Sequence, residues 1–247
     1  MAHIGPAILM SRLRSSPVHG DGSAFPRGVA FLRSGWNRLG SVKLALAAVL
    51  LLCLTACGTP RVSLTEGPRE YLATDYDHVL SRWTRTEELL ALSELDNLLT
   101  VSSTFESWDF RWAYVVRYAH DYRLSVEQRR VLLEKTLAET RAHHQFFVAL
   151  YGSNRRWGDL TKPTSAWIVR LIDDKGNETA PEEIVAIAHP GPIERTYFPY
   201  ASVWRQVFRI KFPAESSSGP TVAKDATYVG LRFAGAQGSE ELHWQLR

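Results

Sequence analysis

The sequence predicts an α+β protein: an antiparallel, Ig-like β-sandwich of six or seven strands, with an inserted α-helical hairpin and a short N-terminal helix. Two observations support this. After Gln145, segments that alternate apolar and polar residues are separated by clusters of glycine, proline, asparagine and aspartate, which is typical of antiparallel strands joined by turns. Two segments with helical periodicity precede them. The sequence contains no internal repeat and no low-complexity tract.

The first expected element is a helix that begins near Asp75. Four residues recur there at spacings of three and four, as on one helical face: Tyr76, Val79, Leu80 and Trp83. The pattern weakens afterwards, and a change from helix to strand near Thr86 fits the sequence. Leu95 to Phe105 predicts the first clear strand, because valine and threonine suit a pleated surface.

Residues 107–142 predict two helices with a very short connection. Ser107 opens the first helix, whose inner face carries Trp108, Trp112, Val115, Val116 and Ala119. Ser125 and Gln128 form a capping-box pattern at the start of the second. The inner side of this second helix carries Leu132, Leu133, Leu137 and Thr140. We expect an antiparallel hairpin that lies on the sheet through the face of Trp112.

Six further strands are expected after the hairpin: 146–151, 166–172, 183–188, 203–212, 227–233 and 241–246. Turn chemistry at 173–177, 189–192 and 235–239 separates several of them. The strand 203–212 alternates clearly, which predicts that Trp204, Phe208 and Ile210 face the core. Residues 215–220 are expected to form a surface loop.

A distinctive apolar run precedes all of these elements. Lys43 is followed by unbroken apolar residues from Leu44 to Leu54 and then by Thr55, Ala56, Cys57 and Gly58. A basic flank, an apolar core and small residues before a cut are the layout of a secretory signal peptide. Leu54-Thr55-Ala56-Cys57 resembles the lipobox of bacterial lipoproteins. The resemblance implies a diacylglycerol on the Cys57 thiol, cleavage just before Cys57, and acylation of the new N-terminus, for example with palmitate.

Two other interpretations of this run are an uncleaved transmembrane anchor and an ordinary secretory signal. The stretch from Leu44 to Ala56 has 13 residues, whereas a membrane span needs roughly 20. The only two cysteines are Cys53 and Cys57. Cleavage before Cys57 would leave one unpaired thiol, which is unusual in a secreted protein. Lipidation accounts for it, so the lipoprotein interpretation is preferred.

This interpretation divides the chain into a leader 1–56, a lipidated tether 57–74 and a single domain 75–247. A 56-residue leader exceeds the usual length of roughly 15–30 residues, so we expect a translation start placed too early, with residues before about 29 outside the real leader. The tether could extend roughly 55 Å and hold the domain clear of the membrane. In lipoproteins an aspartate after the cysteine often causes inner-membrane retention. Gly58 at that position therefore implies the outer membrane, with the domain facing the periplasm.

Net charge argues against nucleic acid as a partner. The leader holds six of the 29 basic residues and one of the 26 acidic residues, so the remaining 191 residues carry a formal net charge of −2 rather than +3. A near-neutral chain without a basic patch lacks the electrostatic footprint of nucleic-acid binding. With no disulfide available after Cys57, packing alone must hold the core.

No catalytic residue and no metal or cofactor site is predicted. The sequence lacks G-x-S-x-G, S-x-x-K, H-E-x-x-H and a phosphate-binding glycine loop. His143-His144 and His120-Asp121 are adjacent pairs, and neighbours on a helix point about 100° apart. The histidines of both pairs are therefore interpreted as helix-end residues, because the negative end of a helix dipole favours them.

Several weaker candidates remain. Asn154 to Leu160 could present arginines and a stacking Trp157, or could be a connector that tucks Trp157 and Leu160 inward, which we prefer. Pro199 to Trp204 is treated alike, with Trp204 in the core. Two carboxylate pairs are expected on solvated faces: Glu127 with Glu134, and Glu182 with Glu183. The polar side of the hairpin is a possible contact surface around Arg129, Arg130 and Lys135.

The predicted function is that of a membrane-anchored envelope lipoprotein, attached through Cys57, which acts as a non-catalytic interaction or assembly module with an envelope protein partner. One alternative is an envelope hydrolase whose site is built from scattered residues. Another is a lipoprotein that binds a small ligand. A cleft with convergent carboxylates or a histidine favours the hydrolase, and a closed apolar cavity favours the ligand binder.

Overall fold

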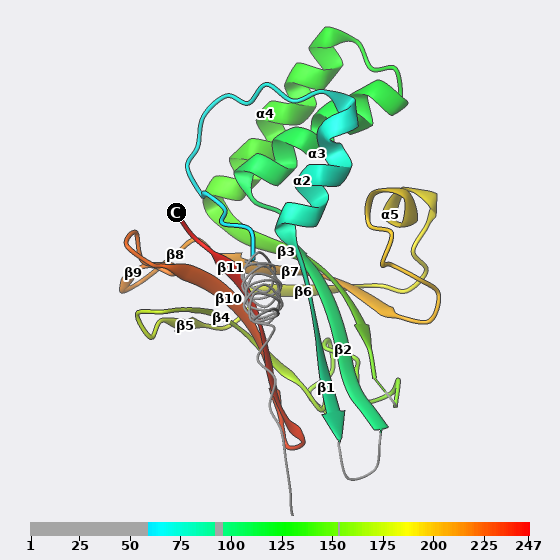
Figure 1. Ribbon diagram of the computed structural model, residues 1–247, viewed down its shortest axis with the longest axis vertical. Coiled ribbons are helices and arrows are strands. Elements are labelled where there is room, and N and C mark those ends of the chain that lie inside the picture. Colours follow the sequence, from blue (N-terminus) through cyan, green and yellow to red (C-terminus); the bar gives the residue numbers. More distant parts are fainter. Residues whose placement is uncertain (1–58, 92–95, 153) are drawn as a thin grey trace, which may run out of the picture. The chain divides into compact units, whose positions relative to one another are not determined.

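The computed structural model describes residues 59–91, 96–152 and 154–247 (Figure 1). The leader and Cys57 lie outside these ranges, so the signal peptide and the lipidation site remain predictions. The described part combines helices with antiparallel sheets, as the sequence predicts. None of its helices is both long and apolar enough to cross a membrane.

Five antiparallel strands form the larger sheet, in the order β1-β2-β3-β7-β6. They are β1 (Thr84–Ala91), β2 (Asp96–Phe105), β3 (His143–Tyr151), β7 (Gln206–Pro213) and β6 (Glu183–Ile187). The change from helix to strand that the sequence suggested near Thr86 occurs at Thr84. β3 begins three residues earlier than expected, because its pairing with β7 extends back to His143, opposite Pro213.

A second antiparallel sheet has four strands in the order β11-β10-β4-β5. They are β11 (Gly238–Gln245), β10 (Tyr228–Gly235), β4 (Ile168–Asp173) and β5 (Glu178–Thr179). The predicted surface loop at 215–220 contains a short ladder of β8 (Glu215–Ser216) and β9 (Gly219–Pro220). The described residues thus contain more strands than the six or seven predicted. Three of the additional strands, β5, β8 and β9, have only two residues each, which is too short for an alternating pattern.

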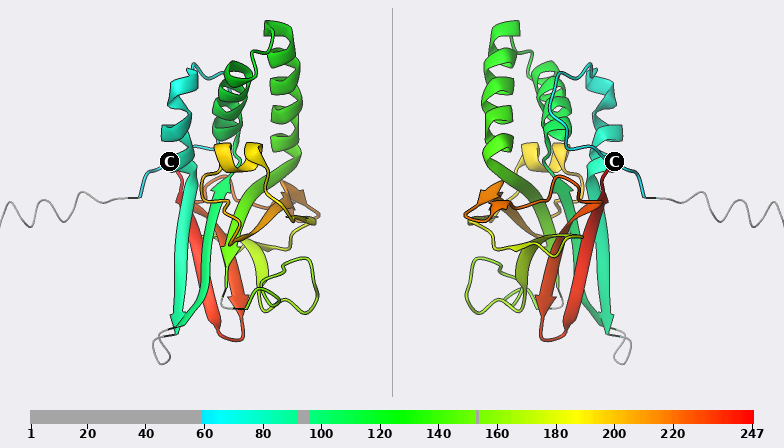
Figure 2. Two further views of the ribbon diagram at one scale, coloured as in Figure 1. Left: turned by 90° about the vertical axis from the view of Figure 1, so that its right-hand side faces the viewer. Right: turned by 90° about the vertical axis from the view of Figure 1, so that its left-hand side faces the viewer.

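The helices gather at one end of the sheets, and the β10–β11 turn lies at the other (Figure 2). They are η1 (Ala73–Asp75), α2 (Tyr76–Trp83), α3 (Trp108–Asp121), α4 (Val126–Ala142) and α5 (Pro192–Tyr197). The Ser107 hydroxyl accepts a hydrogen bond from the Phe110 amide at the start of α3. Ser125 and Gln128 form the predicted capping box of α4, so the local sequence sets both helix starts.

Side chains from the two sheets share one hydrophobic core. Phe105 and Phe146 of the larger sheet stack with ring centroids 4.6 Å apart, and Trp244 of β11 lies 5.3 Å from Phe146. The Trp244 indole donates a hydrogen bond of 2.8 Å to the Trp83 carbonyl. The alternating pattern of β7 correctly predicts that Phe208 and Ile210 are buried.

The aromatic side of α3 is covered by more than the sheet. The ring centroid of Phe110 lies 6.0 Å from that of Tyr76 in α2 and 5.9 Å from that of Phe198, which directly follows α5. Tyr114 lies 5.0 Å from Tyr197 in an edge-on arrangement. The hairpin therefore buries its excess aromatic surface against two further helical segments, which periodicity within the hairpin could not indicate.

The segment predicted as a free tether is docked onto the domain over most of its length, so that prediction is wrong from Val62 onward. Val62 is buried and bridges to Leu246, and its amide donates to the Gln245 carbonyl at 2.8 Å. The Trp108 indole donates to the Gly67 carbonyl at 2.7 Å. Because the tether prediction rested on the lack of periodicity, it missed a segment that is held by isolated contacts.

Asp109 is the central contact of this docking. Its carboxylate accepts hydrogen bonds from Arg69 Nε at 2.9 Å, from the Tyr71 hydroxyl at 2.6 Å and from the Trp83 indole at 2.9 Å. Burial by itself would raise the pKa of Asp109, but these hydrogen bonds outweigh it and hold the pKa below its usual value. Burial and the hydrogen bond to Asp109 raise the pKa of Tyr71 to about 12.

Candidate functional site

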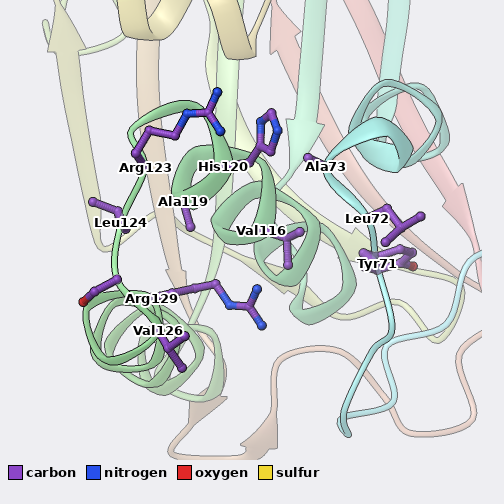
Figure 3. Close-up of a pocket in the computed structure, with 11 residues that line it drawn as sticks. Tyr71, Leu72, Ala73, Val116, Ala119, His120, Arg123, Leu124, Val126 and Arg129 are labelled. Atoms are coloured by element: carbon purple, nitrogen blue, oxygen red, sulfur yellow. The ribbon is translucent and has the colours of Figure 1, made fainter.

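A groove opens at the far end of the helical hairpin, with a volume of about 470 Å³. It lies between α3, the start of α4 and the docked residues Tyr71–Ala73. Its apolar lining comprises Leu72, Ala73, Val116, Ala119, Leu124 and Val126. Figure 3 shows Arg129 extending from α4 towards Val116 of α3. The groove is open rather than enclosed, so it suits a segment of another molecule better than a buried small ligand.

The groove is also lined by His120, Arg123 and Arg129, and His120 Nδ1 lies 3.2 Å from an Asp121 carboxylate oxygen. The nearby Asp121 carboxylate is engaged by Arg117 Nε at 2.8 Å and by the Tyr197 hydroxyl at 3.0 Å. The N-terminal end of α4 at Ser125 adds positive partial charge. An apolar floor with a basic rim matches a ligand that is both apolar and acidic.

Arg123 lies at the tip of the hairpin in a conformation that favours glycine. Its φ is 54°, in the left-handed region. The Leu124 amide donates to the Ala119 carbonyl at 2.9 Å and the Arg123 amide to the His120 carbonyl at 3.3 Å. These two bonds form a Schellman motif, in which the residue at Arg123 is usually glycine. An arginine here costs stability, on the order of 1 kcal/mol.

The first half of α4 is poorly covered. Within this 17-residue helix only Thr136 and Leu137 are buried. Val126 is 85% exposed, and Leu72 on the opposite wall of the groove is 70% exposed. Of the residues predicted on the inner side of α4, only Leu137 is fully buried, whereas Leu132, Leu133 and Thr140 are half-buried. Apolar surface thus remains exposed where the two helices diverge from the sheet.

The predicted polar contact side of the hairpin separates into two faces. Arg129 lines the groove. Arg130 instead pairs with Glu127 at 2.6 Å and with Glu134 at 2.8 Å on the exposed face. Glu127 and Glu134 are therefore solvated residues that support the helix, as expected, and they do not converge on a cleft. Lys135 is exposed as well.

The adjacent histidines His143 and His144 both lie on β3. His143 is also the C-cap residue of α4, so the helix-end interpretation is confirmed for His143 and wrong for His144. Successive strand residues point to opposite faces. His143 Nε2 lies 3.2 Å from Glu182 at the surface, whereas burial lowers the pKa of His144 to about 4. Within the described ranges, no three histidine, cysteine or acidic side chains are grouped as metal ligands.

The remaining sequence candidates are dispersed. Glu183 pairs with Lys211 at 2.7 Å on an exposed strand. In the loop from Asn154, Leu160 is buried, but Trp157 is 52% exposed, so it is not tucked inward as expected. Trp204 is 78% exposed and was wrongly assigned to the core, because β7 begins only at Gln206. Trp112 is half-buried, 6.5 Å from Trp108 of the same helix (ring centroids).

The groove was only partly foreseen from the sequence. The hairpin and Arg129 were singled out, but Arg123, Leu72 and Val126 were not. The signal in the sequence was Arg123, which stands two positions before the Ser125 cap. A helix end there often requires a residue in the left-handed conformation, and that residue is usually glycine. Leu72 could not have been assigned to this site, since its position depends on the docking of the segment before α2.

Comparisons with known proteins do not identify a family. No family model matches the chain, and no curated protein matches it. Among solved structures it is similar to one described as a novel protein of unknown function from Burkholderia pseudomallei. That similarity has 10% sequence identity and a TM-score of 0.34, covering 69% of this chain and 81% of the other. At this TM-score the likeness supports no inference about fold or function.

Proposed function

We propose that this protein is a lipid-anchored lipoprotein of the bacterial envelope that acts as a non-catalytic interaction module. In this proposal, Cys57 carries the anchor and holds the chain at the outer membrane, facing the periplasm. The partner is an envelope protein that places an acidic, amphipathic helix in the groove between α3 and α4. The sequence Leu54-Thr55-Ala56-Cys57 supports the anchor, and the charge and exposure of the groove support the partner.

The single observation that carries the partner proposal is Arg123. A residue that costs stability at its own position indicates that something else favours it, and such strain is concentrated at functional sites. Arg123 lines the groove, where its guanidinium can pair with a carboxylate of the partner. Arg129 supplies a second cation on the opposite helix. The apolar side of an incoming helix would cover Val126 and Leu72.

This proposal predicts that Arg123→Gly weakens binding of the partner without lowering the free energy of unfolding. Glycine adopts the left-handed conformation without strain, so the free energy of unfolding should stay the same or rise by up to about 1 kcal/mol. Binding should weaken, because one charge of the rim is lost. Arg129→Gln should weaken binding too, whereas Arg130→Gln is the matched control, since Arg130 lies outside the groove and pairs with Glu127 and Glu134.

The test uses the full chain, purified in detergent, and two synthetic helical peptides with the same leucine face. One peptide carries glutamates on its polar face and the other carries lysines. The acidic peptide should bind with 1:1 stoichiometry and protect the amides around Val126, and the basic peptide should not bind. Equal binding of both peptides, or undiminished binding by Arg123→Gly and Arg129→Gln, would refute the assigned occupant.

A photo-crosslinking amino acid at Val126 checks the same site in the native envelope. The proposal expects a cross-linked protein that disappears in the Arg123→Gly background. The same probe at Ala138, which is exposed on α4 outside the groove, should not capture that protein. Capture from both positions would indicate random encounters and contradict a specific groove partner.

The architecture that we propose for the domain is a β-sandwich in which the two sheets pack face to face. The contacts of Trp244 in one sheet with Phe105 and Phe146 in the other support it. The strand order does not support the Ig-like variant, since β2 pairs with β3 on the far side of the hairpin insertion, whereas the second strand of an Ig domain pairs with the fifth.

A further inference from the structure

A second pocket, of about 260 Å³, lies where the docked N-terminal segment meets α2, α3 and the end of the chain. Four of its lining residues are arginines: Arg61, Arg69, Arg82 and Arg247. Asp109 is the one carboxylate among its lining side chains. Guanidinium groups therefore outnumber side-chain carboxylates four to one around a pocket large enough for a phosphate group.

The hydrogen bonds of these arginines divide them into two kinds. Arg69 is fully engaged, because it donates to Asp109 and to the carbonyls of Thr65, Gly67 and Pro68. Arg82 approaches Asp109 only at 3.7 Å. Arg61 and Arg247 form no side-chain hydrogen bond or ion pair within the described residues, and both are exposed. Arg69 thus forms a wall of the pocket, and three guanidiniums remain for an anion.

Asp109 does not cancel this positive charge. Its carboxylate already accepts hydrogen bonds from Arg69, Tyr71 and Trp83, so it is committed to the docking contact. Arg82 lies 3.7 Å from the same carboxylate, and no hydrogen bond joins the two groups within the described residues. An anion in the pocket would receive hydrogen bonds that no protein group now accepts.

The short stretch of chain between Cys57 and Val62 limits how far the pocket can lie from the lipidation site. Val62 is fixed by its bridge to Leu246, and the residues from Gly58 to Arg61 can extend by at most about 14 Å. If Cys57 carries the lipid, as in the function proposed above, the pocket must lie at the membrane surface. A tether of roughly 55 Å would have permitted any orientation, but docking of the segment removes that freedom.

We propose that this arginine pocket binds the phosphate of an anionic phospholipid headgroup and so orients the domain on its membrane. Arg61, Arg82 and Arg247 bind the phosphate oxygens, and Arg69 and Asp109 hold the pocket in shape. Each basic residue near an anionic membrane surface strengthens binding by about fivefold. The interaction weakens as salt is added, because the groups at the mouth of the pocket are exposed.

The test measures thermal unfolding of the full chain in a non-ionic detergent, with three additives in separate titrations. These are a short-chain phosphatidylglycerol, the matching phosphatidylcholine and inorganic phosphate. Phosphatidylglycerol should raise the melting temperature with concentration, because a ligand of the folded state stabilises it. Inorganic phosphate should do so only at much higher concentration. Phosphatidylcholine has the same phosphodiester, but the arginines repel its choline cation, so it should respond much more weakly than phosphatidylglycerol. Added sodium chloride at 0.5 M should reduce the response to phosphatidylglycerol.

The diagnostic variants are Arg61→Gln and Arg247→Gln, each expected to weaken phosphatidylglycerol binding about fivefold. Their unliganded urea midpoints should match that of the wild type, since neither side chain makes a hydrogen bond or ion pair within the described residues. Arg155→Gln is the matched control, because Arg155 is also exposed and lies outside the pocket. It should retain full binding.

Three results would count against this inference in different ways. Equal responses to the two phospholipids, or unaltered binding by Arg61→Gln and Arg247→Gln, would overturn the pocket. Inorganic phosphate that binds as tightly as phosphatidylglycerol would overturn the headgroup as its source. The intact mass of the same preparation reports lipid on Cys57 separately. An unlipidated chain that still binds through these arginines would refute the lipoprotein proposal and leave the pocket standing.

Discussion

Replacement of Asp109 by asparagine should detach the N-terminal segment and destabilise the domain. The carboxylate side chain is 9% exposed and lies 2.9 Å from Arg69 Nε. It also accepts from the Tyr71 hydroxyl at 2.6 Å and the Trp83 indole at 2.9 Å. Asparagine keeps the shape but removes the charge. Its side-chain NH2 group can only donate hydrogen bonds, so it replaces one of the two accepting oxygens with a donor. One oxygen remains for three donors, two from the docked segment and one from α2.

The expected cost is about 3–5 kcal/mol, the range for breaking a buried ion pair by the removal of one partner. Each hydrogen bond to a charged group contributes about 1.5–3 kcal/mol, and desolvation of the carboxylate offsets part of their sum. Asp225→Asn is the matched control. Asp225 is 80% exposed beside Lys175, so this change should cost less than about 1 kcal/mol.

The assay is urea unfolding of the full chain in detergent, together with hydrogen exchange of the Val62 amide. Asp109→Asn should lower the midpoint and expose Val62 to exchange. In the wild type, the pKa of Asp109 lies below its unfolded value, so its contribution is present above pH ~4 and is lost as the pH falls through the lower folded pKa. The variant should lack this part of the acid sensitivity. A cost below about 1 kcal/mol, with Val62 still protected, would refute the assigned role of Asp109.

Four other predictions follow from the chain and its contacts. Cys57→Ala should abolish anchoring, measured by detergent partitioning and intact mass; a wild-type chain without lipid would contradict the lipoprotein proposal. A chain that begins at Thr74 should be less stable in urea than one that begins at Gly58, because it loses Val62, Arg69 and Tyr71; equal stability would show that the docking contributes nothing. Trp112→Ala should cost less than the roughly 3–5 kcal/mol expected for the fully buried Trp83→Ala, as measured by urea unfolding, and an equal cost would contradict the half-buried position. Since burial lowers the pKa of His144 to about 4, wild-type stability should fall as the pH falls from about 6.5 to 4, by up to about 1.4 kcal/mol for each pH unit; a His144→Gln chain with the same pH dependence would refute this.

Local sequence determined the elements whose signals are local. Ser125 and Gln128 complete a capping box, and Ser107 accepts a hydrogen bond from a backbone amide of its own helix, so both helices start at the serines that the sequence indicated. The alternation of Phe208 and Ile210 in β7 is also a property of neighbouring residues, and the predicted burial is confirmed. Capping and strand periodicity depend on backbone geometry within a few residues, which is why the sequence alone suffices there.

Only the tertiary structure decided the residues whose environment comes from distant segments. Trp204 and Trp157 look like core residues in isolation, yet both are exposed, because no segment within the described ranges covers them. His144 looked like a helix-end residue. It lies instead on β3, which pairs with β7, and burial lowers the pKa of its imidazole. In each case the outcome depends on which surface another part of the chain occupies, and periodicity carries no information about that.

The segment between Gly58 and Thr74 shows the same division most clearly. Its sequence correctly indicated that no regular helix or strand runs through most of it, because prolines and glycines interrupt every pattern. Whether it is free depends on Asp109 and Trp108, which lie about 40 positions further along the chain. Sequence therefore determined the irregular backbone, and the fold determined that this backbone is fixed. That second fact is what brings Arg61, Arg82 and Arg247 around one pocket, and Leu72 to the wall of the groove.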